Sequence, residues 1–172
     1  MGQVISQDSL ILQRQIWKGN GQSVVLVSGC FDLLHPGHIR LLEQARAYGD
    51  ILLVGVQSDA GVRASKGHIV SSGSAGGTVP RPITPAIERA EILAALAAVD
   101  YVTEFDGSPD ALVARLAPDT VVYGAAPGGE APAKNVRQDR ASGATGANSV
   151  AILLEPGYST ESLLERIVQR PA

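Results

Sequence analysis

The chain has 172 residues, 45% of them hydrophobic and 18% charged, and its formal net charge is −3. This composition is typical of one globular domain with a sizeable core, and it excludes a disordered chain. The small negative charge, without a basic block, argues against nonspecific nucleic-acid binding but allows a local basic pocket. Apolar runs are too short to span a membrane, and the single cysteine fits a reducing cytoplasm. We therefore expect a single cytoplasmic domain over residues 1–172, with neither nucleic acid nor membrane as a partner.

Apolar runs and helical patterns alternate through the first half of the chain. A lead-in helix is expected over residues 6–18, within a lead-in segment that reaches residue 20, because apolar residues recur there at roughly helical spacing. The continuous apolar runs at 23–29 and 50–58 predict buried strands. Helical spacing of apolar residues predicts a helix at 36–48, and a short helix is expected at 60–66.

The second half continues the alternation after a Gly/Ser-rich segment. Residues 67–82, GHIVSSGSAGGTVPRP, are expected to form a long flexible loop, either a lid over a ligand or plain surface. A helix over 84–99 should begin with Thr84 as its cap and Pro85 at its first position. The remaining predicted elements are a strand at 100–105, a helix at 108–117, a strand at 119–124, an irregular segment at 125–147, a strand at 149–155 and a helix at 159–169.

This order of elements predicts an α/β fold with a doubly wound, Rossmann-like sheet of five parallel strands. Strands separated by helices of this length require right-handed crossovers, which give a parallel sheet. Such sheets bind ligands at the carboxyl ends of their strands, near the point where the strand order reverses. The segment SGCFDLLHPGH (28–38) follows the first buried strand and EPGYST (155–160) follows the last. We therefore expect both segments on one face of the molecule.

Two of the three histidines lie in GCFDLLHPGH (29–38), at the start of a predicted helix. Pro36 suits a first helical turn, and Gly37 lets a ligand approach the backbone closely. His35 and His38 lie on the same side of that turn, where free backbone N–H groups and the helix dipole also point. This pattern predicts an anion site with two imidazole donors and no protein-bound metal. Two alternatives stay open: a metal site with Asp32 as a third ligand, and histidines that only cap or pack.

The stretch GCFDLLHPGHIRLLEQARAYGDILLVGVQSD closely resembles the HxGH nucleotidyltransferase (cytidylyltransferase-like) superfamily. It resembles most the sugar-nucleotide branch, the adenylyltransferase domains of ADP-heptose synthases (D-glycero-β-D-manno-heptose 1-phosphate adenylyltransferases). The resemblance continues through SKG (65–67), RPITPAIERAEILAALAAVDYV (81–102) and PGYSTESLLERI (156–167). It implies that a phosphomonoester oxygen attacks the α-phosphorus of a nucleoside triphosphate and that pyrophosphate leaves. ATP, a sugar phosphate such as heptose 1-phosphate, and Mg²⁺ carried with the triphosphate are the implied ligands.

The resemblance also implies roles for individual residues. His35 and His38 match the HxGH pair, which donates to the nucleotide phosphates, and Lys66 matches the lysine that bridges the substrate phosphates; these three are the predicted catalytic residues. Asp32, Arg63 and Lys66 are expected at the acceptor, with Asp32 orienting the acceptor or a lysine. The expected nucleotide-binding residues are Gly29, Cys30, Phe31, Gly37, Arg89, Gly124, Ser159 and Thr160. The alternatives are a surface role for Lys66 and Arg63, a helix-surface salt bridge for Arg89, and a plain N-cap for Ser159 and Thr160.

The chain departs from the branch pattern in two places. After the fourth predicted strand the branch carries a lysine and a Gly-Gly-Asp-Tyr stretch, whereas this chain has Tyr123 at the lysine and Ala125 and Ala126 in place of Gly-Asp. Glu161 replaces the second threonine of the branch's STT turn. These departures leave open a cytidylyltransferase acting on glycerol phosphate or a similar alcohol phosphate, and a catalytically lapsed nucleotide-binding protein. Assembly as a homodimer also stays open.

Overall fold

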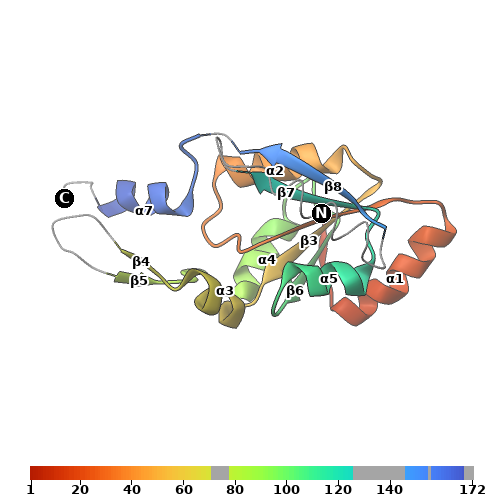
Figure 1. Ribbon diagram of the computed structural model, residues 1–172, viewed down its shortest axis with the longest axis horizontal. Coiled ribbons are helices and arrows are strands. Elements are labelled where there is room, and N and C mark those ends of the chain that lie inside the picture. The colour runs from red at the N-terminus through yellow and green to blue at the C-terminus, as the bar shows by residue number, and fades with distance from the viewer. Residues whose placement is uncertain (71–77, 126–145, 155, 169–172) are drawn as a thin grey trace.

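The computed structural model describes residues 1–70, 78–125, 146–154 and 156–168 (Figure 1). Within these ranges the helices are α1 (Gln7–Gly19), α2 (Pro36–Arg46), α3 (Asp59–Lys66), α4 (Ala86–Ala94), α5 (Pro109–Leu116) and α7 (Thr160–Val168). The strands are β1 (Gln3–Val4), β2 (Val24–Gly29), β3 (Ile51–Gln57), β4 (His68–Val70), β5 (Thr78–Pro80), β6 (Tyr101–Phe105), β7 (Thr120–Ala125) and β8 (Asn148–Leu153).

One parallel sheet organises the molecule, with the strand order β1-β6-β3-β2-β7-β8. The chain moves outward from β2 through β3 to β6, and then returns to β7 on the other side of β2. The strand order therefore reverses between β2 and β7, and the predicted doubly wound sheet is confirmed. Its five expected strands are present. A sixth, β1, pairs Gln3 with Tyr101 at the edge and is too short to show a hydrophobic pattern.

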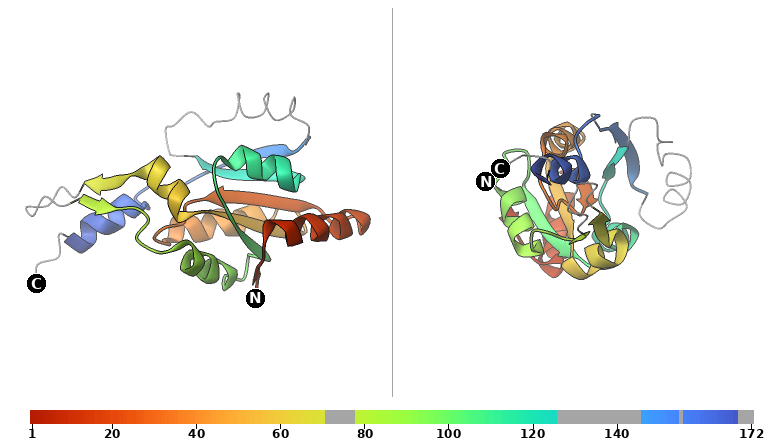
Figure 2. Two further views of the ribbon diagram at one scale, coloured as in Figure 1. Left: turned by 90° about the horizontal axis from the view of Figure 1, so that it is seen from below. Right: turned by 90° about the vertical axis from the view of Figure 1, so that its left-hand side faces the viewer.

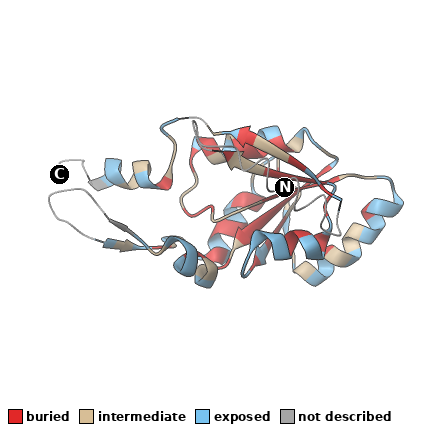
Figure 3. Cartoon of the chain, in the orientation of Figure 1, coloured by how far each residue is buried: buried red, intermediate tan, exposed pale blue. Residues whose placement is uncertain are grey.

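Alternate residues of each central strand are buried against different helix layers (Figures 1 and 3). On β2, Val25 and Val27 join the core cluster that contains residues of α2 and α4. Val24 and Leu26 join the opposite cluster, which contains residues of α1 and α5. Because both faces are covered, β2 and β3 are apolar over most of their length, and this pattern made them visible in the sequence.

Aspartates just before the strands anchor the amino-terminal edge of the sheet. Asp50 accepts from the Ser23 N–H at 2.8 Å, and Asp119 accepts from the Val24 N–H at 2.7 Å. Asp100 accepts from the Leu52 N–H at 2.8 Å. These carboxylates accept hydrogen bonds from backbone N–H groups at the strand starts, so side chains of the sheet's own amino-terminal edge satisfy these donors. The residues of the candidate site lie at the opposite edge, where the parallel strands end.

The helix expected at 84–99 begins differently from its prediction. Pro85 occupies the N-cap position without a side-chain cap, and the helix α4 ends at Ala94. The predicted Thr84 cap is therefore wrong. The backbone N–H of Thr84 donates to Asp32 at 3.0 Å, and its carbonyl accepts from Arg89 Nε at 2.8 Å. A long-range contact to Asp32 thus decides the conformation at this helix start.

The segment predicted as a flexible loop, 67–82, contains an antiparallel hairpin. Strand β4 pairs with β5, with His68 opposite Pro80 and Val70 opposite Thr78. The prediction of irregular structure is wrong for these strands, while residues 71–77 lie outside the described part of the chain. The hairpin and α7 extend from the same end of the sheet (Figures 1 and 2). Within the described ranges, no helix is both long and apolar enough to cross a bilayer.

Candidate active site

The HPGH turn (residues 30–38) lies at the carboxyl end of β2, where the strand order of the sheet reverses. The strand ends at Gly29, and α2 begins at Pro36 with His35 in extended conformation at its N-cap. Between them Phe31 has a φ of 50° and is 4% exposed. A left-handed conformation is unusual for a bulky aromatic residue and is typical of turns at functional sites. The turn folds the chain back so that the two histidines start the helix.

The two histidines of the turn lie against each other. The ring centroids of His35 and His38 are 3.7 Å apart with an interplanar angle of 18°, and the Phe31 ring lies 5.3 Å from His38. Both Nδ1 atoms are buried without a hydrogen-bond partner among the described residues. An unpaired buried polar atom is costly and is often found where a ligand completes the hydrogen bonding. The geometry fits the predicted pair of imidazole donors.

Burial keeps both imidazoles neutral at neutral pH. Burial, with smaller contributions from the charges of His35 and Arg81, lowers the pKa of His38 to about 4. Burial also lowers the pKa of His35, against an opposing effect of the Glu161 carboxylate. In the free protein the pair therefore offers neutral N–H donors rather than positive charge. A bound triphosphate would raise both pKa values, because a nearby anion favours the protonated ring.

These pKa shifts predict that the protein loses stability in mild acid. A histidine with a lowered folded-state pKa binds its proton more readily in the unfolded chain, so the unfolding free energy rises with pH in that range. For His38 the stability should be complete above about pH 6.5 and should fall as the pH drops towards about 4. Urea unfolding across this range should show the loss, and His38→Gln should flatten it. Parallel curves for the variant and the wild type would contradict the assignment.

A buried ion pair joins the HPGH turn to the segment after the hairpin. Arg81 Nε donates to Asp32 Oδ2 at 2.5 Å, and the two side chains are 5% and 0% exposed. The other oxygen, Oδ1, accepts from the backbone N–H groups of Ile83 at 2.7 Å and Thr84 at 3.0 Å. Both carboxylate oxygens are thus bound within the protein. Asp32 thus orients an arginine, and its predicted role at the acceptor stays a prediction.

Arg89 also donates its hydrogen bonds to other groups of the protein. Its side chain is 1% exposed, and its guanidinium donates to the carbonyl of Cys30, to the carbonyl of Thr84 and to Asp59 at 2.7 Å. Arg89 is therefore a buried structural arginine and not the helix-surface salt bridge considered as its alternative, and its nucleotide contact stays a prediction. The arginine fixes the backbone at Cys30, beside the ion pair of Asp32. Burial raises the pKa of the Cys30 thiol, so the thiol is not activated as a nucleophile.

The last turn before α7 packs directly on the start of α2. A Cβ placed on Gly37 would lie 3.1 Å from the Tyr158 Cβ and 3.1 Å from His35 Nδ1. The Tyr158 ring lies 6.5 Å from the His35 ring, and the Arg40 guanidinium carbon lies 5.3 Å from its centroid. Gly37 is therefore required for this close approach, which brings opposite ends of the chain together. The expectation that 28–38 and 156–160 share one face is confirmed by these contacts.

The residues at the start of α7 have distinct surroundings. Ser159 Oγ accepts from the Ser162 N–H at 3.0 Å, so it acts as the N-cap that sequence reasoning kept as an alternative. Thr160 is buried at 7% exposure. Glu161 Oε1 lies 3.4 Å from Arg81 Nη1, and its side chain is 58% exposed. The nucleotide contacts of Ser159 and Thr160 stay predictions, now placed beside the histidine pair.

The remaining predicted residues lie around this edge. Lys66 and Arg63 are exposed on α3, and the carbonyl of Gly67, next to Lys66, accepts from the Arg81 N–H at 3.1 Å. Gly124 lies on β7, where an added Cβ would lie 2.8 Å from Leu154. Gly29 ends β2, and there an added Cβ would lie 3.1 Å from the Phe31 ring. An added side chain would crowd its neighbour at both glycines, and their nucleotide contacts stay predictions.

The altered stretch after β7 is described only in part. Tyr123 is partly buried, and its hydroxyl is buried without a partner among the described residues. Ala125 ends the strand, whereas Ala126 lies outside the described residues. The consequence of losing the branch's charged residues therefore stays a prediction.

Sequence reasoning missed Arg81 and Tyr158. Arg81 lies at the end of the Gly/Ser-rich segment 67–82 and precedes a proline, a position that gives no hint of burial. Tyr158 lies inside the quoted PGYST segment, but no periodicity marks its contact with Gly37. Each residue acquires its role from a partner distant in the chain. Arg81 could be recognised only in the structure, as a buried arginine beside an aspartate.

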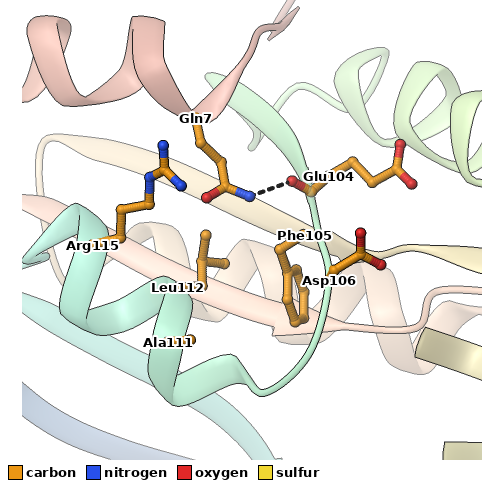
Figure 4. Close-up of a pocket in the computed structure, with 7 residues that line it drawn as sticks. All are labelled: Gln7, Glu104, Phe105, Asp106, Ala111, Leu112 and Arg115. Atoms are coloured by element: carbon orange, nitrogen blue, oxygen red, sulfur yellow. Dashed lines mark hydrogen bonds between the residues drawn. The ribbon is translucent and has the colours of Figure 1, made fainter. Parts of the chain in front are cut away.

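A separate pocket of about 630 Å³ lies between the starts of α1 and α5, at the end of β6. Its lining residues are Gln7, Glu104, Phe105, Asp106, Ala111, Leu112 and Arg115. The Gln7 side chain donates to the Glu104 carbonyl at 2.8 Å, and the Glu104 carboxylate points away from Arg115 (Figure 4). None of the predicted site residues lines this pocket, and it lacks converging cations, so phosphate chemistry is better placed at the histidine pair.

Metal ligation by the histidines has little support. The part of the chain that the structure describes contains no group of three or more His, Cys, Asp or Glu side chains arranged to hold a metal ion. Asp32, the third ligand considered above, already binds Arg81 and two backbone N–H groups.

Comparison with known proteins agrees with this geometry. Residues 26–135 match the family model for cytidylyltransferase-like proteins. Over 168 residues the chain is 35% identical to the bifunctional protein HldE of Shewanella denitrificans, covering 97% of this chain and 32% of that protein. It is 40% identical over 122 residues to the HldE of Wolinella succinogenes, covering 70% of this chain and 23% of that protein. The chain thus spans about a third or less of these curated relatives.

A solved structure shares the fold. The lipopolysaccharide core biosynthesis protein of Thermoplasma volcanium superposes with a TM-score of 0.57 at 23% identity, covering 78% of this chain and 98% of that one. The matched residues 26–135 include β2, the HPGH turn and Arg81, which are the centre of the candidate site. These matches support the predicted enzyme class, a nucleotidyltransferase. From the shared family model and the geometry together, the chain belongs to the cytidylyltransferase-like family.

Proposed function

We propose that this chain transfers AMP from ATP to a sugar phosphate such as heptose 1-phosphate and releases pyrophosphate. One observation carries the proposal. The stacked pair of His35 and His38 lies at the start of α2, packed against the turn that begins α7, at the reversal of a parallel sheet. Two helix starts and two imidazoles at one point provide several N–H donors for a chain of phosphates.

The reaction needs alignment more than covalent chemistry. An oxygen of the acceptor phosphate forms a bond to the α-phosphorus, the bond from that phosphorus to the bridging oxygen breaks, and pyrophosphate leaves with the electron pair. His35 and His38 would donate to the nucleotide phosphates as charge shifts towards the leaving group. Lys66 would bridge the phosphates of both substrates from the end of α3. Mg²⁺, when bound with the triphosphate, would neutralise part of its charge.

The choice of ATP and a sugar phosphate rests on sequence similarity. The adenylyltransferase domains of ADP-heptose synthases carry the motifs quoted above, and the bifunctional HldE proteins are 35% and 40% identical to this chain. Tyr123 and Glu161 depart from that branch pattern, and both lie among the described residues. A cytidylyltransferase using an alcohol phosphate is therefore kept as the second candidate, and it is tested in the same assay.

Pyrophosphate release separates the candidates. The protein is incubated with ATP or CTP, Mg²⁺ and a panel of sugar phosphates and alcohol phosphates. We expect ATP with a sugar 1-phosphate to give the fastest release. Faster release with CTP and glycerol phosphate would transfer the assignment to the second candidate. Triphosphate binding without release from any pair would identify a catalytically lapsed binding protein, and the proposal would fail.

A further inference from the structure

Arg81 has one strong and two weak partners. Its Nε donates to Asp32 at 2.5 Å, whereas Nη1 lies 3.4 Å from a Glu161 oxygen and Nη2 lies 3.6 Å from the Cys30 sulfur. Hydrogen bonds between ionised groups are usually about 2.8 Å long. The Asp32 contact therefore fixes the guanidinium, and its two outer nitrogens are held loosely. A buried arginine with loosely held nitrogens at a phosphate site is suited to bind an incoming anion.

Glu161 places a carboxylate where the site would hold an anion. It lies in the first turn of α7, beside the buried Thr160, with its own side chain 58% exposed. Its oxygen faces Arg81, and its charge acts on His35, whose pKa it raises against the effect of burial. A negative group thus lies next to an arginine, a histidine and a helix start, the surroundings that a phosphate requires.

Building on the proposed function, we propose that Arg81 binds a phosphate of the nucleoside triphosphate and that the Glu161 carboxylate occupies this phosphate position in the free protein. The triphosphate then displaces Glu161, whose exposed side chain is free to turn towards solvent. Asp32 keeps Arg81 in place during the exchange. In the branch pattern this position is a threonine, so the chain has a competing anion where its relatives offer a hydroxyl group.

Binding of inorganic tripolyphosphate and of ATP to the full chain, measured by calorimetry, tests the proposal. Glu161→Gln keeps the size of the side chain and removes its charge, and it should bind tripolyphosphate roughly tenfold more tightly than the wild type. Glu165→Gln, exposed one turn further along α7, changes the net charge equally and should alter the affinity by less than about twofold. The matched pair therefore separates a local effect from a general change in charge.

Arg81 is tested in the Glu161→Gln background. Arg81→Lys keeps a positive charge beside Asp32 but removes the outer nitrogens, so the gain in affinity should be lost. Equal affinity of Glu161→Gln and Glu165→Gln for tripolyphosphate would overturn the proposal. Weaker binding by Glu161→Gln than by the wild type would also overturn it, because the carboxylate would then support the site instead of competing for it. Neither outcome depends on whether Arg81→Lys folds.

The test is independent of turnover. Tripolyphosphate binding requires no acceptor, so tighter binding by Glu161→Gln supports the phosphate position of Arg81 even if no substrate pair releases pyrophosphate. In that case only the proposed reaction fails. Conversely, an active enzyme in which Glu161→Gln and Glu165→Gln behave alike leaves the reaction in place and removes this inference. In an active enzyme, Glu161→Gln should also lower the KM for ATP.

Discussion

His38→Ala is expected to slow pyrophosphate release about 10²–10³-fold, the usual cost of losing one donor to a developing phosphate charge. The ring is stacked on His35 with a centroid distance of 3.7 Å, at the point where α2 begins. Removing it takes away a donor and also the partner that orients His35. Steady-state kinetics with saturating ATP and acceptor measures the loss, and circular dichroism with a thermal melt checks that the fold persists.

The structure also indicates which property of His38 matters. Because its pKa is lowered to about 4, His38 presents a neutral N–H donor in the free protein. His38→Gln keeps an amide donor without any charge, so it should retain more activity than His38→Ala. Equal loss in both variants would favour a charged imidazole in the ternary complex. Wild-type rates in His38→Ala would remove the histidine from the mechanism altogether.

Asp32→Asn is expected to lower the unfolding free energy by about 3–5 kcal/mol, because it leaves the buried Arg81 guanidinium without its anion. The Asp32 side chain is fully buried and contacts Arg81 at 2.5 Å. The amide that replaces it cannot balance the arginine charge. Urea unfolding followed by circular dichroism measures the difference.

A surface ion pair of the same length provides the control. Asp8 contacts Arg115 at 2.5 Å, but the two side chains are 83% and 49% exposed. Asp8→Asn should therefore change the unfolding free energy by less than about 1 kcal/mol, as is usual for exposed pairs. Similar losses in Asp8→Asn and Asp32→Asn would show that burial of the Asp32–Arg81 pair carries no special weight, and Asp32 would lose its role in fixing Arg81.

Local sequence patterns were sufficient for most of the architecture. The central residues of the stretches 23–29 and 50–58 are apolar because helices cover both faces of the sheet, and such runs can be recognised without any structure. The histidine pair was also readable, since His35 and His38 are three residues apart around a Pro-Gly start to a helix. Their convergence with 156–160 followed from the rule that parallel strands present their carboxyl ends to one edge.

Contacts between distant residues decided the rest. Asp32 finds Arg81 49 positions away, and the backbone N–H of Thr84 also goes to Asp32, which is why Thr84 does not cap α4. The two-residue strand β1 exists because β6 offers an edge, a condition that no pattern within residues 3–4 records. The protonation state of His38 could not be predicted from the sequence either, because its pKa depends on burial and on neighbours that only the packed fold brings together.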